Sequence, residues 1–333
     1  MDQLPLLNKI NQFQGMRLLV VGDIGLDEYI SGDASRLSPE APVPVLDVLN
    51  EQSHLGLSGN VAHNIKSLGG EPLLVSVVGN DLRGKRITQL LESSEIDGNH
   101  VLVDESRFTT HKIRVMAQHH HLVRIDYETR KALSRDTQEL FYQKIETLLP
   151  SCAGIVLQDY AKGTVTPSLV QYLVRIAHAQ NKKVLLDPHR TVALKNYYGV
   201  DLMTPNHEEA FILSGMASKD HHLEENLQEV AQRMMATVAS DRLVITRGKL
   251  GMRLFENKDE INLPTYAKKV FDVTGAGDAV ISAIALAWLS GSSLQQACII
   301  ANYAAGIVVG KVGCVPCSLK ELIESIKHSE HAP

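Results

Sequence analysis

The sequence is poor in aromatic residues, in cysteine and in long apolar runs. Aromatic residues make up 5% of the chain, so few side chains are available to stack on the bases of a nucleic acid. The longest apolar stretches are interrupted by glycine, serine or asparagine, and none is predicted to cross a membrane. The first residues, Met1-Asp2-Gln3, lack the basic and apolar regions of a signal peptide. We therefore expect a cytoplasmic protein with neither a nucleic-acid nor a membrane partner.

An excess of positive charge is also missing. The chain has 33 basic and 38 acidic residues, a net charge of −5, and no basic stripe. Apolar residues are abundant instead, at 44% of 333 residues, which is enough for a large core. This length and composition favour one large α/β domain with an accessory part, or two domains.

The few cysteines and a run of histidines do not form a convincing metal site. Cys152 and Cys298 are isolated in apolar segments, which is typical of small core residues. Cys314 and Cys317 have the spacing of a redox or metal pair, but the second pair that a zinc site needs is missing. In His119-His120-His121, only two side chains would share one face of a strand, and no carboxylate or cysteine nearby completes a set. We expect structural cysteines, and exposed or sugar-facing histidines.

Short apolar segments alternate with longer helical segments through most of the chain. Strands spaced by helices of ten or more residues predict an α/β fold with a doubly wound, mainly parallel sheet and helices on both faces. The strands are expected at 17–22, 73–78, 154–158, 184–187, 202–204 and 242–246, and the helices at 59–68, 166–179, 206–214, 223–239, 275–289 and 294–309.

Polar residues gather where these strands end. Asp23, Asp159 and Asp187 close or follow three of the strands, and Thr246 closes a fourth. Because parallel strands present their carboxyl ends at one edge of a sheet, a ligand is expected at this edge. Asp27 follows Asp23 by four residues, and two carboxylates on a strand-end loop suit the hydroxyls of a sugar. A plain surface turn explains the pair equally well.

The stretch Phe271-Asp-Val-Thr-Gly-Ala-Gly-Asp278 opens an apolar helical run. Gly275 and Gly277 allow a tight turn in which consecutive N–H groups converge at a helix N-terminus, a geometry that binds anions. Asp278 would lie in the first turn, where its carboxylate could take a proton from a hydroxyl that attacks phosphorus. A glycine-rich turn followed by an aspartate that compensates the helix dipole is the simpler alternative.

Other stretches could hold a metal ion or a phosphate. Asn206 and Glu209, three residues apart at a helix start, could hold Mg²⁺ directly or through water, but helix capping explains the same pair. Residues 79–85 match Gly-x4-Gly-Lys, yet Arg86 replaces the Ser or Thr that holds Mg²⁺ in a P-loop, so we predict a turn and a helix start. Lys162 could meet a phosphate or sugar oxygen, or be a solvated loop lysine.

Two β-prone segments are expected to form a small lid outside the main sheet. The first spans about residues 35–48, where Pro42 and Pro44 exclude a central strand but suit an edge strand or a projecting flap. The second spans about residues 106–126. If the two segments pair, the lid could exclude water that would compete with a sugar hydroxyl for the phosphoryl group.

Together these motifs resemble the PfkB (ribokinase-like) carbohydrate kinases. The resemblance rests on Asp272-Val-Thr-Gly-Ala-Gly-Asp278, Thr204-Pro-Asn-x-x-Glu209, Asp187-Pro and Asn60-Val-Ala, and it extends from Leu18 to about Gly313. It implies a ribokinase-like fold and a single kinase domain over residues 1–333. Stretches at 35–45, 157–163 and 308–311 are similar to kinases of D-glycero-β-D-manno-heptose 7-phosphate. Such kinases occur alone or fused to a nucleotidyltransferase, and here we expect the kinase part only.

The resemblance implies a role for each group of residues. Asp278 would deprotonate the anomeric hydroxyl, and the N–H groups of Gly275, Ala276 and Gly277 would stabilise charge on the transferring phosphoryl group. The cofactors would be ATP and Mg²⁺, with a monovalent cation left open. The residues expected near ATP are Asn206, His207, Glu208, Glu209, Thr246, Gly248, Gly251 and Asn302, with Glu209 reaching Mg²⁺ through water. Those expected near the sugar are Asp23, Asp27, Asn60, Lys112, Arg124 and Lys162.

The implied product is a heptose 1,7-bisphosphate, a precursor of the ADP-heptose used in lipopolysaccharide cores. Members of the family are commonly dimers that touch through their lids, so a homodimer is expected. Departures from the family pattern fall on the acceptor side: Leu57 replaces a glycine, and histidines stand at other positions, which are His111, His120, His121 and His189. We hypothesise that these histidines form a modified acceptor pocket. A PfkB-like kinase for another sugar, sugar phosphate or nucleoside stays open, as does, more remotely, a non-catalytic sugar-binding protein on the same fold.

Overall fold

A nine-stranded sheet runs through the centre of the protein. The computed structural model describes residues 3–117, 120–216, 226–267 and 269–328, and in these residues the strand order is β13-β12-β11-β10-β9-β8-β1-β4-β5. Neighbouring strands from β11 to β5 are parallel, whereas β12 and β13 add an antiparallel edge. The doubly wound, mainly parallel sheet is therefore confirmed. The strands are β1 (Arg17–Gly22), β4 (Glu71–Val78), β5 (Val101–Val103), β8 (Gly154–Gln158), β9 (Lys183–Asp187), β10 (Leu202–Met203), β11 (Arg242–Thr246), β12 (Met252–Glu256) and β13 (Asp259–Leu263).

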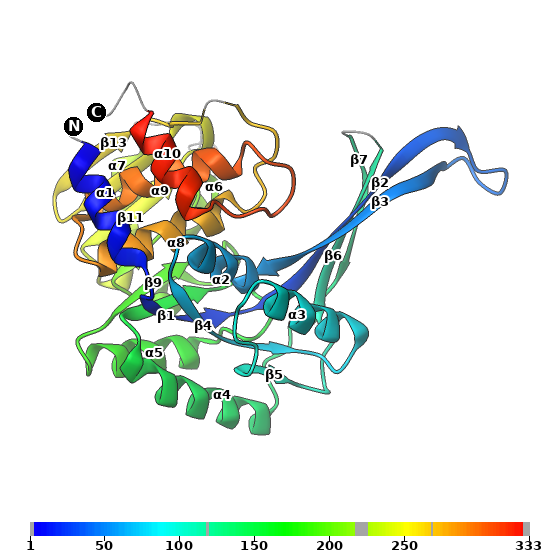
Figure 1. Cartoon of the computed structure of the whole chain (residues 1–333). Coiled ribbons are helices and arrows are strands. Elements are labelled where there is room, and N and C mark those ends of the chain that lie inside the picture. Colours follow the sequence, from blue (N-terminus) through cyan, green and yellow to red (C-terminus); the bar gives the residue numbers. More distant parts are fainter. Residues whose placement is uncertain (1–2, 118–119, 217–225, 268, 329–333) are drawn as a thin grey trace.

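Helices cover both faces of this sheet (Figure 1). Leu18 and Val20 of β1 point into one core and Leu19 and Val21 into the other, because successive side chains of a strand alternate between its faces. The first core contains side chains of α1 (Gln3–Ile10), α2 (Ser58–Ser67), α3 (Leu82–Ser93), α8 (Ala276–Leu289), α9 (Leu294–Val308) and α10 (Leu319–Lys327). The second contains side chains of α4 (Arg135–Leu148), α5 (Pro167–His178), α6 (His207–Leu213) and α7 (Leu227–Val238). None of the described helices is long and apolar enough to cross a membrane.

Most elements predicted from the alternation are confirmed. Strands β1, β8 and β11 have the predicted bounds, and helices α5, α6, α8 and α9 start and end within one residue of theirs. Of the helix expected at 223–239, residues 223–225 lie outside the described residues. The described part of that helix begins at Leu227. Apolar runs and caps thus located six of the nine strands that the described residues form in the main sheet, whereas β5, β12 and β13 were not predicted.

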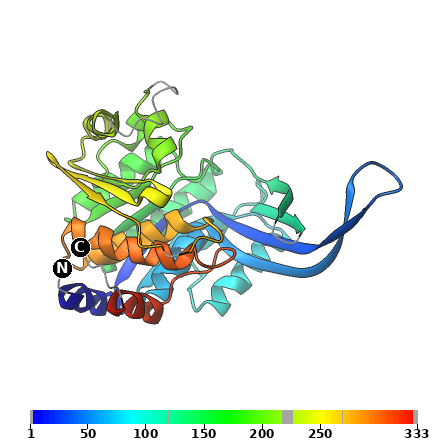
Figure 2. The same ribbon diagram turned by 90° about the horizontal axis from the view of Figure 1, so that it is seen from above.

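A second sheet of four strands projects from the main one (Figures 1 and 2). Its order is β3-β2-β6-β7, and β2 and β3 form a long antiparallel hairpin whose far end stands away from the body of the protein. The strands are β2 (Ile24–Leu37), β3 (Pro44–Leu57), β6 (Thr110–Ala117) and β7 (His120–Tyr127). We call this the lid sheet. It grows directly from the carboxyl end of β1, since only Asp23 separates β1 from β2.

The lid sheet differs from the prediction in extent and in pairing. Residues 35–48 do not pair with β6 or β7; residues 25–32 of β2 pair with β6 instead. The proline-containing segment forms the free end of the β2–β3 hairpin, because β2 starts at the main sheet and carries its turn outward. Glycine and charged residues interrupt the first half of β2, so its sequence carries no clear strand signal.

The two faces of the lid sheet differ in polarity. Strand alternation and register place polar side chains on one face, which we call the polar face: Asp27, Tyr29, Lys112, Arg114, Arg124 and Asp126. The opposite face carries mainly apolar side chains, and we call it the apolar face: Ile30, Ile113, Val115, Val123 and Ile125. Val123 and Ile125 are 51% and 41% exposed, so the apolar face is open to solvent near β7.

Candidate active site

Helix α8 begins at the glycine-rich turn. Gly275, just before the first helical residue, has a φ of +79°, a conformation that L side chains rarely adopt. A Cβ on Gly275 would lie 2.8 Å from Nδ2 of Asn60, and a Cβ on Gly277 would have no neighbour within 4 Å. The N-terminus of α8 is therefore open, and Ala276 and Gly277 line an adjoining cavity. We call residues 275–277 the anion turn, because an anion there would meet N–H groups and the positive end of the helix dipole.

Asp278 is buried in the first turn of α8 and accepts hydrogen bonds from three side chains. Asn60 Nδ2 donates to Oδ2 at 2.6 Å, Tyr160 Oη donates to Oδ1 at 2.7 Å, and Gln158 Nε2 lies 3.4 Å from Oδ1. Burial raises the pKa of Asp278 to about 6, although the hydrogen bonds from Tyr160 and Asn60 favour the ionised form. The carboxylate is thus charged at neutral pH and suited to accept a proton.

Asp27 lies on the polar face of the lid sheet, close to Asp278. It is a residue of β2, so the prediction that it belongs to a strand-end loop is wrong. Its Oδ1 accepts a hydrogen bond of 2.8 Å from Arg114, and the Cys314 thiol donates to Oδ2 at 3.4 Å. The charge of Asp27 contributes to the raised pKa of Asp278, which places the two carboxylates in one electrostatic environment.

Lys112 lies near these two carboxylates and a tyrosine. Its Nζ lies 5.6 Å from the centre of the Tyr160 ring, and its charge lowers the pKa of Asp278. Burial lowers the pKa of Lys112 itself, while Asp27 raises it. The salt bridges found among the described residues include none to Lys112. Lys112 is therefore a partly buried cation available to an anionic ligand.

Asp23 does not fit the predicted role in sugar binding. Its carboxylate accepts backbone hydrogen bonds from Tyr160, Lys162 and Thr164, at 3.1, 3.0 and 3.0 Å. Asp23 follows the end of β1, as predicted. Its carboxylate, however, is hydrogen-bonded to the backbone of a loop far along the chain, and the residue is only 2% exposed. Asp23 thus fixes the loop after β8 rather than presenting oxygens to a ligand.

The other two expected acceptor cations are already paired. Lys162 Nζ forms an ion pair with Glu128, and Arg124 on β7 forms two hydrogen bonds of 2.9 Å with Asp126. Lys162 is buried near the site, and its charge lowers the pKa of Lys112. Arg124 is exposed on the lid sheet. Their pairing leaves Lys112 as the better candidate for contact with an anion.

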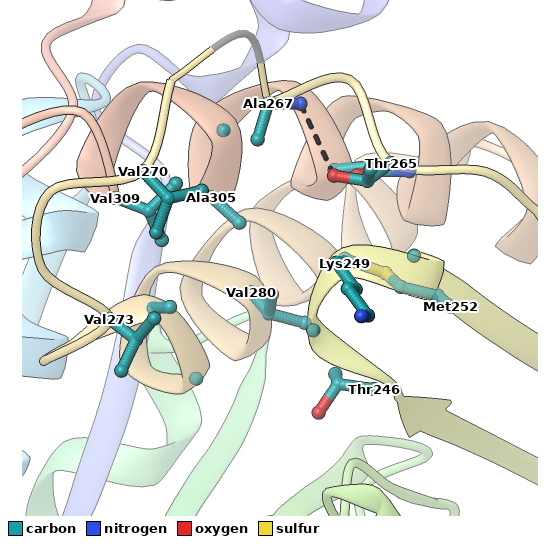
Figure 3. A pocket seen from close by; sticks show the side chains of 16 residues that line it. Thr246, Lys249, Met252, Thr265, Ala267, Val270, Val273, Val280, Ala305 and Val309 are labelled. Atoms are coloured by element: carbon teal, nitrogen blue, oxygen red, sulfur yellow. Dashed lines mark hydrogen bonds between the residues drawn. The ribbon is translucent and has the colours of Figure 1, made fainter.

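A cavity of about 460 Å³ adjoins the N-terminus of α8 (Figure 3). Valines of α8 and the neighbouring loop form much of one wall, and Thr246 and Lys249 lie on the side of β11. The size and mainly apolar lining suit a nucleotide base and ribose. Four of the residues predicted to bind ATP line this cavity together with Ala276 and Gly277 of the anion turn: Thr246, Gly248, Gly251 and Asn302.

Two of these residues shape the cavity through the backbone. Gly251 has a φ of +80°, and a Cβ there would lie 2.1 Å from the carbonyl oxygen of Leu263. Asn302 on α9 donates to the carbonyl of Pro264 at 2.6 Å and accepts from the N–H of Tyr266 at 3.4 Å. Asn302 therefore holds the loop that forms the cavity wall.

The Asn206–Glu209 segment forms a complete capping box at the start of α6. Asn206 Oδ1 accepts from the N–H of Glu209 at 3.0 Å, and Glu209 accepts from the N–H of Asn206 at 2.9 Å. Asn206 also forms a β-bridge with Thr246, so this helix start lies beside the cavity, although none of residues 206–209 lines it. His207 packs on Phe211, and Glu208 pairs with Arg190 at 2.9 Å. The capping alternative is confirmed, and it leaves one Glu209 oxygen for water or metal.

The histidines do not form one pocket. His111 points away from the polar face and contacts Arg83 and Glu28, at 2.9 and 2.7 Å. His120 and His121 are exposed and pair with Ala117 and Met116, at the opposite end of the β6–β7 hairpin from His111. His189 forms a hydrogen bond with Thr191, and burial and the charge of Lys162 lower its pKa. His119 lies outside the described residues. The hypothesis of a shared histidine pocket is thus wrong, because strand alternation and register separate its members.

The remaining motifs have structural explanations. Asp81 caps α3 by accepting from the N–H of Gly84 at 2.8 Å, so residues 79–85 form the predicted turn and helix start. Its other oxygen accepts from the N–H of Thr109 at 2.9 Å. Cys314 and Cys317 are free and buried. The described residues contain no group of three or more metal-ligating side chains.

Three residues of the site were not predicted: Gln158, Tyr160 and Arg114. Tyr160 and Asp278 are 118 residues apart, and spacing in the sequence carries no sign of such a contact. Two signals were available: Gln158 and Tyr160 lie at the end of an apolar strand, where ligand-binding side chains gather, and both belong to the stretch 157–163 that is similar to heptose 7-phosphate kinases.

Comparisons with known proteins support the family and the fold inferred for this chain. Residues 20–321 match the model of the pfkB family carbohydrate kinases. The chain is 40% identical to the bifunctional protein HldE of Geobacter metallireducens, over 94% of this chain and 64% of the relative. It is 37% identical to HldE of Paramagnetospirillum magneticum, over 98% of this chain and 66% of the relative. The chain thus spans slightly less than two thirds of the length of these relatives.

Solved structures show the same fold at lower identity. Arabidopsis thaliana ribokinase, complexed with ribose and ATP, superposes with a TM-score of 0.75 at 20% identity, over 95% of this chain and all of that one. Escherichia coli phosphofructokinase-2, in complex with potassium, gives 0.74 at 19% identity, over 95% and 99%. The fold is ribokinase-like. This chain belongs to the PfkB carbohydrate kinases, phosphotransferases with an alcohol group as acceptor.

Proposed function

We propose that this sugar kinase transfers the γ-phosphoryl group of ATP to O1 of D-glycero-β-D-manno-heptose 7-phosphate. The product would be the 1,7-bisphosphate, on the route to ADP-heptose for lipopolysaccharide cores. The observation that carries the proposal is Lys112, a partly buried cation that forms no salt bridge within the described part of the chain and lies near the proposed base, Asp278, and the lid carboxylate Asp27. A sugar that already carries a phosphate needs such a cation in addition to the groups that bind ATP.

The proposed chemistry uses the carboxylate and the open helix N-terminus together. Asp278 accepts the proton of the sugar hydroxyl as its oxygen forms the new bond to the γ-phosphorus, and the bond from that phosphorus to the β-phosphate oxygen breaks to release ADP. N–H groups of Gly275 to Gly277 would face the transferring group, where they stabilise negative charge without reorganisation. Asp27 and Asn60 would hold other hydroxyls of the sugar.

The proposed nucleotide site combines the cavity with the start of α6. The base and ribose would occupy the cavity lined by Gly251 and Val280, which places the phosphates toward the anion turn. Glu209 fits Mg²⁺ bound through water, because it retains an oxygen beyond its capping bond. Mg²⁺ prefers oxygen ligands and usually keeps several waters, and it would neutralise charge between the phosphates. ATP accompanies the related ribokinase and potassium the related phosphofructokinase, so a monovalent cation is part of the proposal.

The acceptor assignment also rests on the stretches similar to heptose 7-phosphate kinases, which lie in the β2–β3 hairpin, after β8 and after α9. Another acceptor remains the alternative, since Leu57 and His189 depart from the family pattern. His111 points to the opposite face from Lys112, His120 and His121 lie at the other end of the β6–β7 hairpin, and His189 is affected by the charge of Lys162, so the structure gives this alternative less support than the sequence does.

An ADP-release assay with Mg-ATP tests the acceptor. The panel contains heptose 7-phosphate, sedoheptulose 7-phosphate, fructose 6-phosphate, ribose and a nucleoside. We expect the fastest turnover with heptose 7-phosphate, and we expect Lys112→Gln to raise KM for that sugar without changing KM for ATP. The matched control is Lys85→Gln, which removes a lysine of α3. Faster turnover of ribose or the nucleoside would overturn the acceptor assignment and leave the kinase assignment intact.

We further propose a homodimer formed through the apolar faces of two lid sheets. Val115, Val123 and Ile125 offer adjacent apolar side chains on a projecting sheet, and a second copy of the chain would cover them. Val123→Arg should reduce the mass measured by light scattering from twice 36.6 kDa to the single value. Leu82→Arg, at an 81% exposed position on α3, is the control. A monomer mass for the unsubstituted chain would contradict the proposal.

A further inference from the structure

Tyr160 joins the proposed base to the loop after β8. Its hydroxyl donates to Oδ1 of Asp278 at 2.7 Å, and the Lys112 ammonium lies over its ring. Burial and the nearby carboxylates raise the pKa of Tyr160 well above its ordinary value, so the phenol keeps its proton and serves as a hydrogen-bond donor. Neither the sequence motifs nor the proposed role of Asp278 assigns a function to this residue.

The backbone of Tyr160 is held in place by Asp23. The buried Asp23 carboxylate accepts from the N–H groups of Tyr160, Lys162 and Thr164, all in one loop. Within the same loop, Asp159 Oδ1 accepts from the N–H of Ala161 at 2.7 Å, and Ala161 has a φ of +54°. A loop with so many bonds to buried carboxylates has little freedom, so the Tyr160 ring is presented to Asp278 from a fixed position.

We infer that Tyr160 is a positioning residue: it fixes one oxygen of the Asp278 carboxylate and stabilises its ionised form, so that the other oxygen receives the proton of the acceptor. Oδ1 accepts from Tyr160 and faces Gln158, whereas within the described residues Oδ2 accepts only from Asn60. A carboxylate oxygen accepts about two hydrogen bonds, so Oδ2 keeps room for one more. The inference rests on the proposed role of Asp278.

Several charged groups around Asp278 affect its ionisation, and the hydrogen bond from Tyr160 acts together with them. Asp27 from β2 and the Cys314 thiol from the loop after α9 lie on one side, Lys112 from β6 faces the Tyr160 ring, and Asp187 ends β9. Burial and the neighbouring Asp27 disfavour the charge of Asp278. The donors that favour it are Tyr160 and Asn60, together with the ammonium of Lys112. Loss of the phenol hydroxyl should therefore raise the pKa of Asp278.

The test is the pH dependence of kcat/KM for the sugar in Tyr160→Phe. A hydrogen bond to a charged group is worth enough to move a pKa by about one unit, so the acidic limb should shift upward by about one pH unit. The rate at pH 6 should fall roughly fivefold more than the rate at pH 8, with KM for ATP unchanged. The control is Tyr172→Phe, which removes another hydroxyl bonded to a carboxylate, that of Glu146, outside the site.

A readout that needs no turnover accompanies the kinetics. Carbon-13 NMR of aspartate carboxyl groups would follow the titration of Asp278, whose signal is identified by its loss in Asp278→Asn. The inference predicts the same upward shift in Tyr160→Phe by both methods. An unchanged titration, or an equal fall of the rate at pH 6 and pH 8, would overturn it. The kinetic assay uses whichever sugar the unsubstituted chain phosphorylates, so failure of the heptose assignment is seen separately.

Discussion

The amide of Asn60 donates a 2.6 Å hydrogen bond to the carboxylate of Asp278, and this bond requires the glycine at position 275. A Cβ on Gly275 would lie 2.8 Å from the same amide nitrogen. Asn60 belongs to α2, which begins where the lid strand β3 ends, and Asp278 belongs to α8, which begins at the anion turn. The bond therefore links the lid side of the site to the turn proposed to receive the phosphoryl group.

Asp278→Asn should lower kcat by about 10²–10⁴-fold, because loss of a general base costs this much. Affinity for ATP should stay near the original value, since the nucleotide cavity is unaltered. Isothermal titration with ATP and a steady-state assay measure the two quantities. Asp259→Asn, at the exposed start of β13, is the control. A kcat within threefold of the original would remove Asp278 from the mechanism.

The same variant should change the pH dependence of stability. The pKa of Asp278 is raised from 3.8 to about 6 in the folded protein, so the folded state holds this proton at pH values where the unfolded state has lost it. Its contribution to stability is present below pH 4 and is lost as the pH rises through 6. Relative to the original chain, Asp278→Asn should gain up to about 3 kcal/mol in the free energy of unfolding between pH 4 and pH 7. Urea titrations at both pH values measure the gain, and a difference independent of pH would contradict it.

Gly251→Ala should weaken ATP binding strongly. The new Cβ would lie 2.1 Å from the Leu263 carbonyl oxygen, so the strands that bound the nucleotide cavity must move apart. Gly215→Ala is a matched control, because Gly215 also has a positive φ, of +72°, but has open space around its Cβ position. Both variants also carry the backbone cost of a non-glycine residue at positive φ, roughly 1–3 kcal/mol. Equal ATP affinities in the two variants would exclude a role for Gly251 in shaping the cavity.

Glu209→Ala should raise the Mg²⁺ concentration needed for half-maximal activity. It also removes half of a capping box, so its stability should fall by about 1 kcal/mol. Gln296→Ala separates the two effects, because Gln296 completes an equivalent capping box with Ser293 at the start of α9. That control should lose similar stability and keep the original Mg²⁺ dependence. If both variants respond alike to Mg²⁺, Glu209 acts only as a cap.

Leu57 should tolerate glycine better than alanine. Its φ of +59° and ψ of −132° belong to a region that strongly favours glycine, and the resulting strain costs roughly 1–3 kcal/mol. Glycine removes this strain, whereas alanine keeps it and also loses the buried side chain. At Leu55, in extended β3 and 2% exposed, the usual order should hold, with alanine the less damaging. Chemical denaturation of the four variants tests the reversal, and the same order at both positions would refute it.

The sequence predicted the inner strands of the main sheet, β1, β4 and β8 to β11, because local signals suffice there, but it did not predict the edge strands β5, β12 and β13. Strands β1 and β8 are apolar runs bounded by glycine, and α9 has its cap at Ser293, so each boundary is marked in the chain itself. The lid was harder. Residues 25–32 pair with β6, which lies far along the chain, and no apolar run marks this part of β2.

The candidate site was predicted in part, for a similar reason. Asp278 and the anion turn lie within one octet, and Gly251 lies in a turn that only glycine can form. The bonds of Asp278 to Asn60 and Tyr160 join segments 218 and 118 residues apart. Asp23 shows the converse: its position at a strand end was predicted correctly, and its use in holding a loop depends on a tertiary contact.

The most direct test of the central claim is phosphorus-31 NMR of the product formed from Mg-ATP and heptose 7-phosphate. The proposal predicts ADP together with a sugar that bears a second phosphate, coupled to its anomeric proton, and this signal should vanish in Asp278→Asn. A new phosphate on another carbon of the sugar, release of inorganic phosphate alone, or an undiminished product signal in Asp278→Asn would contradict the account.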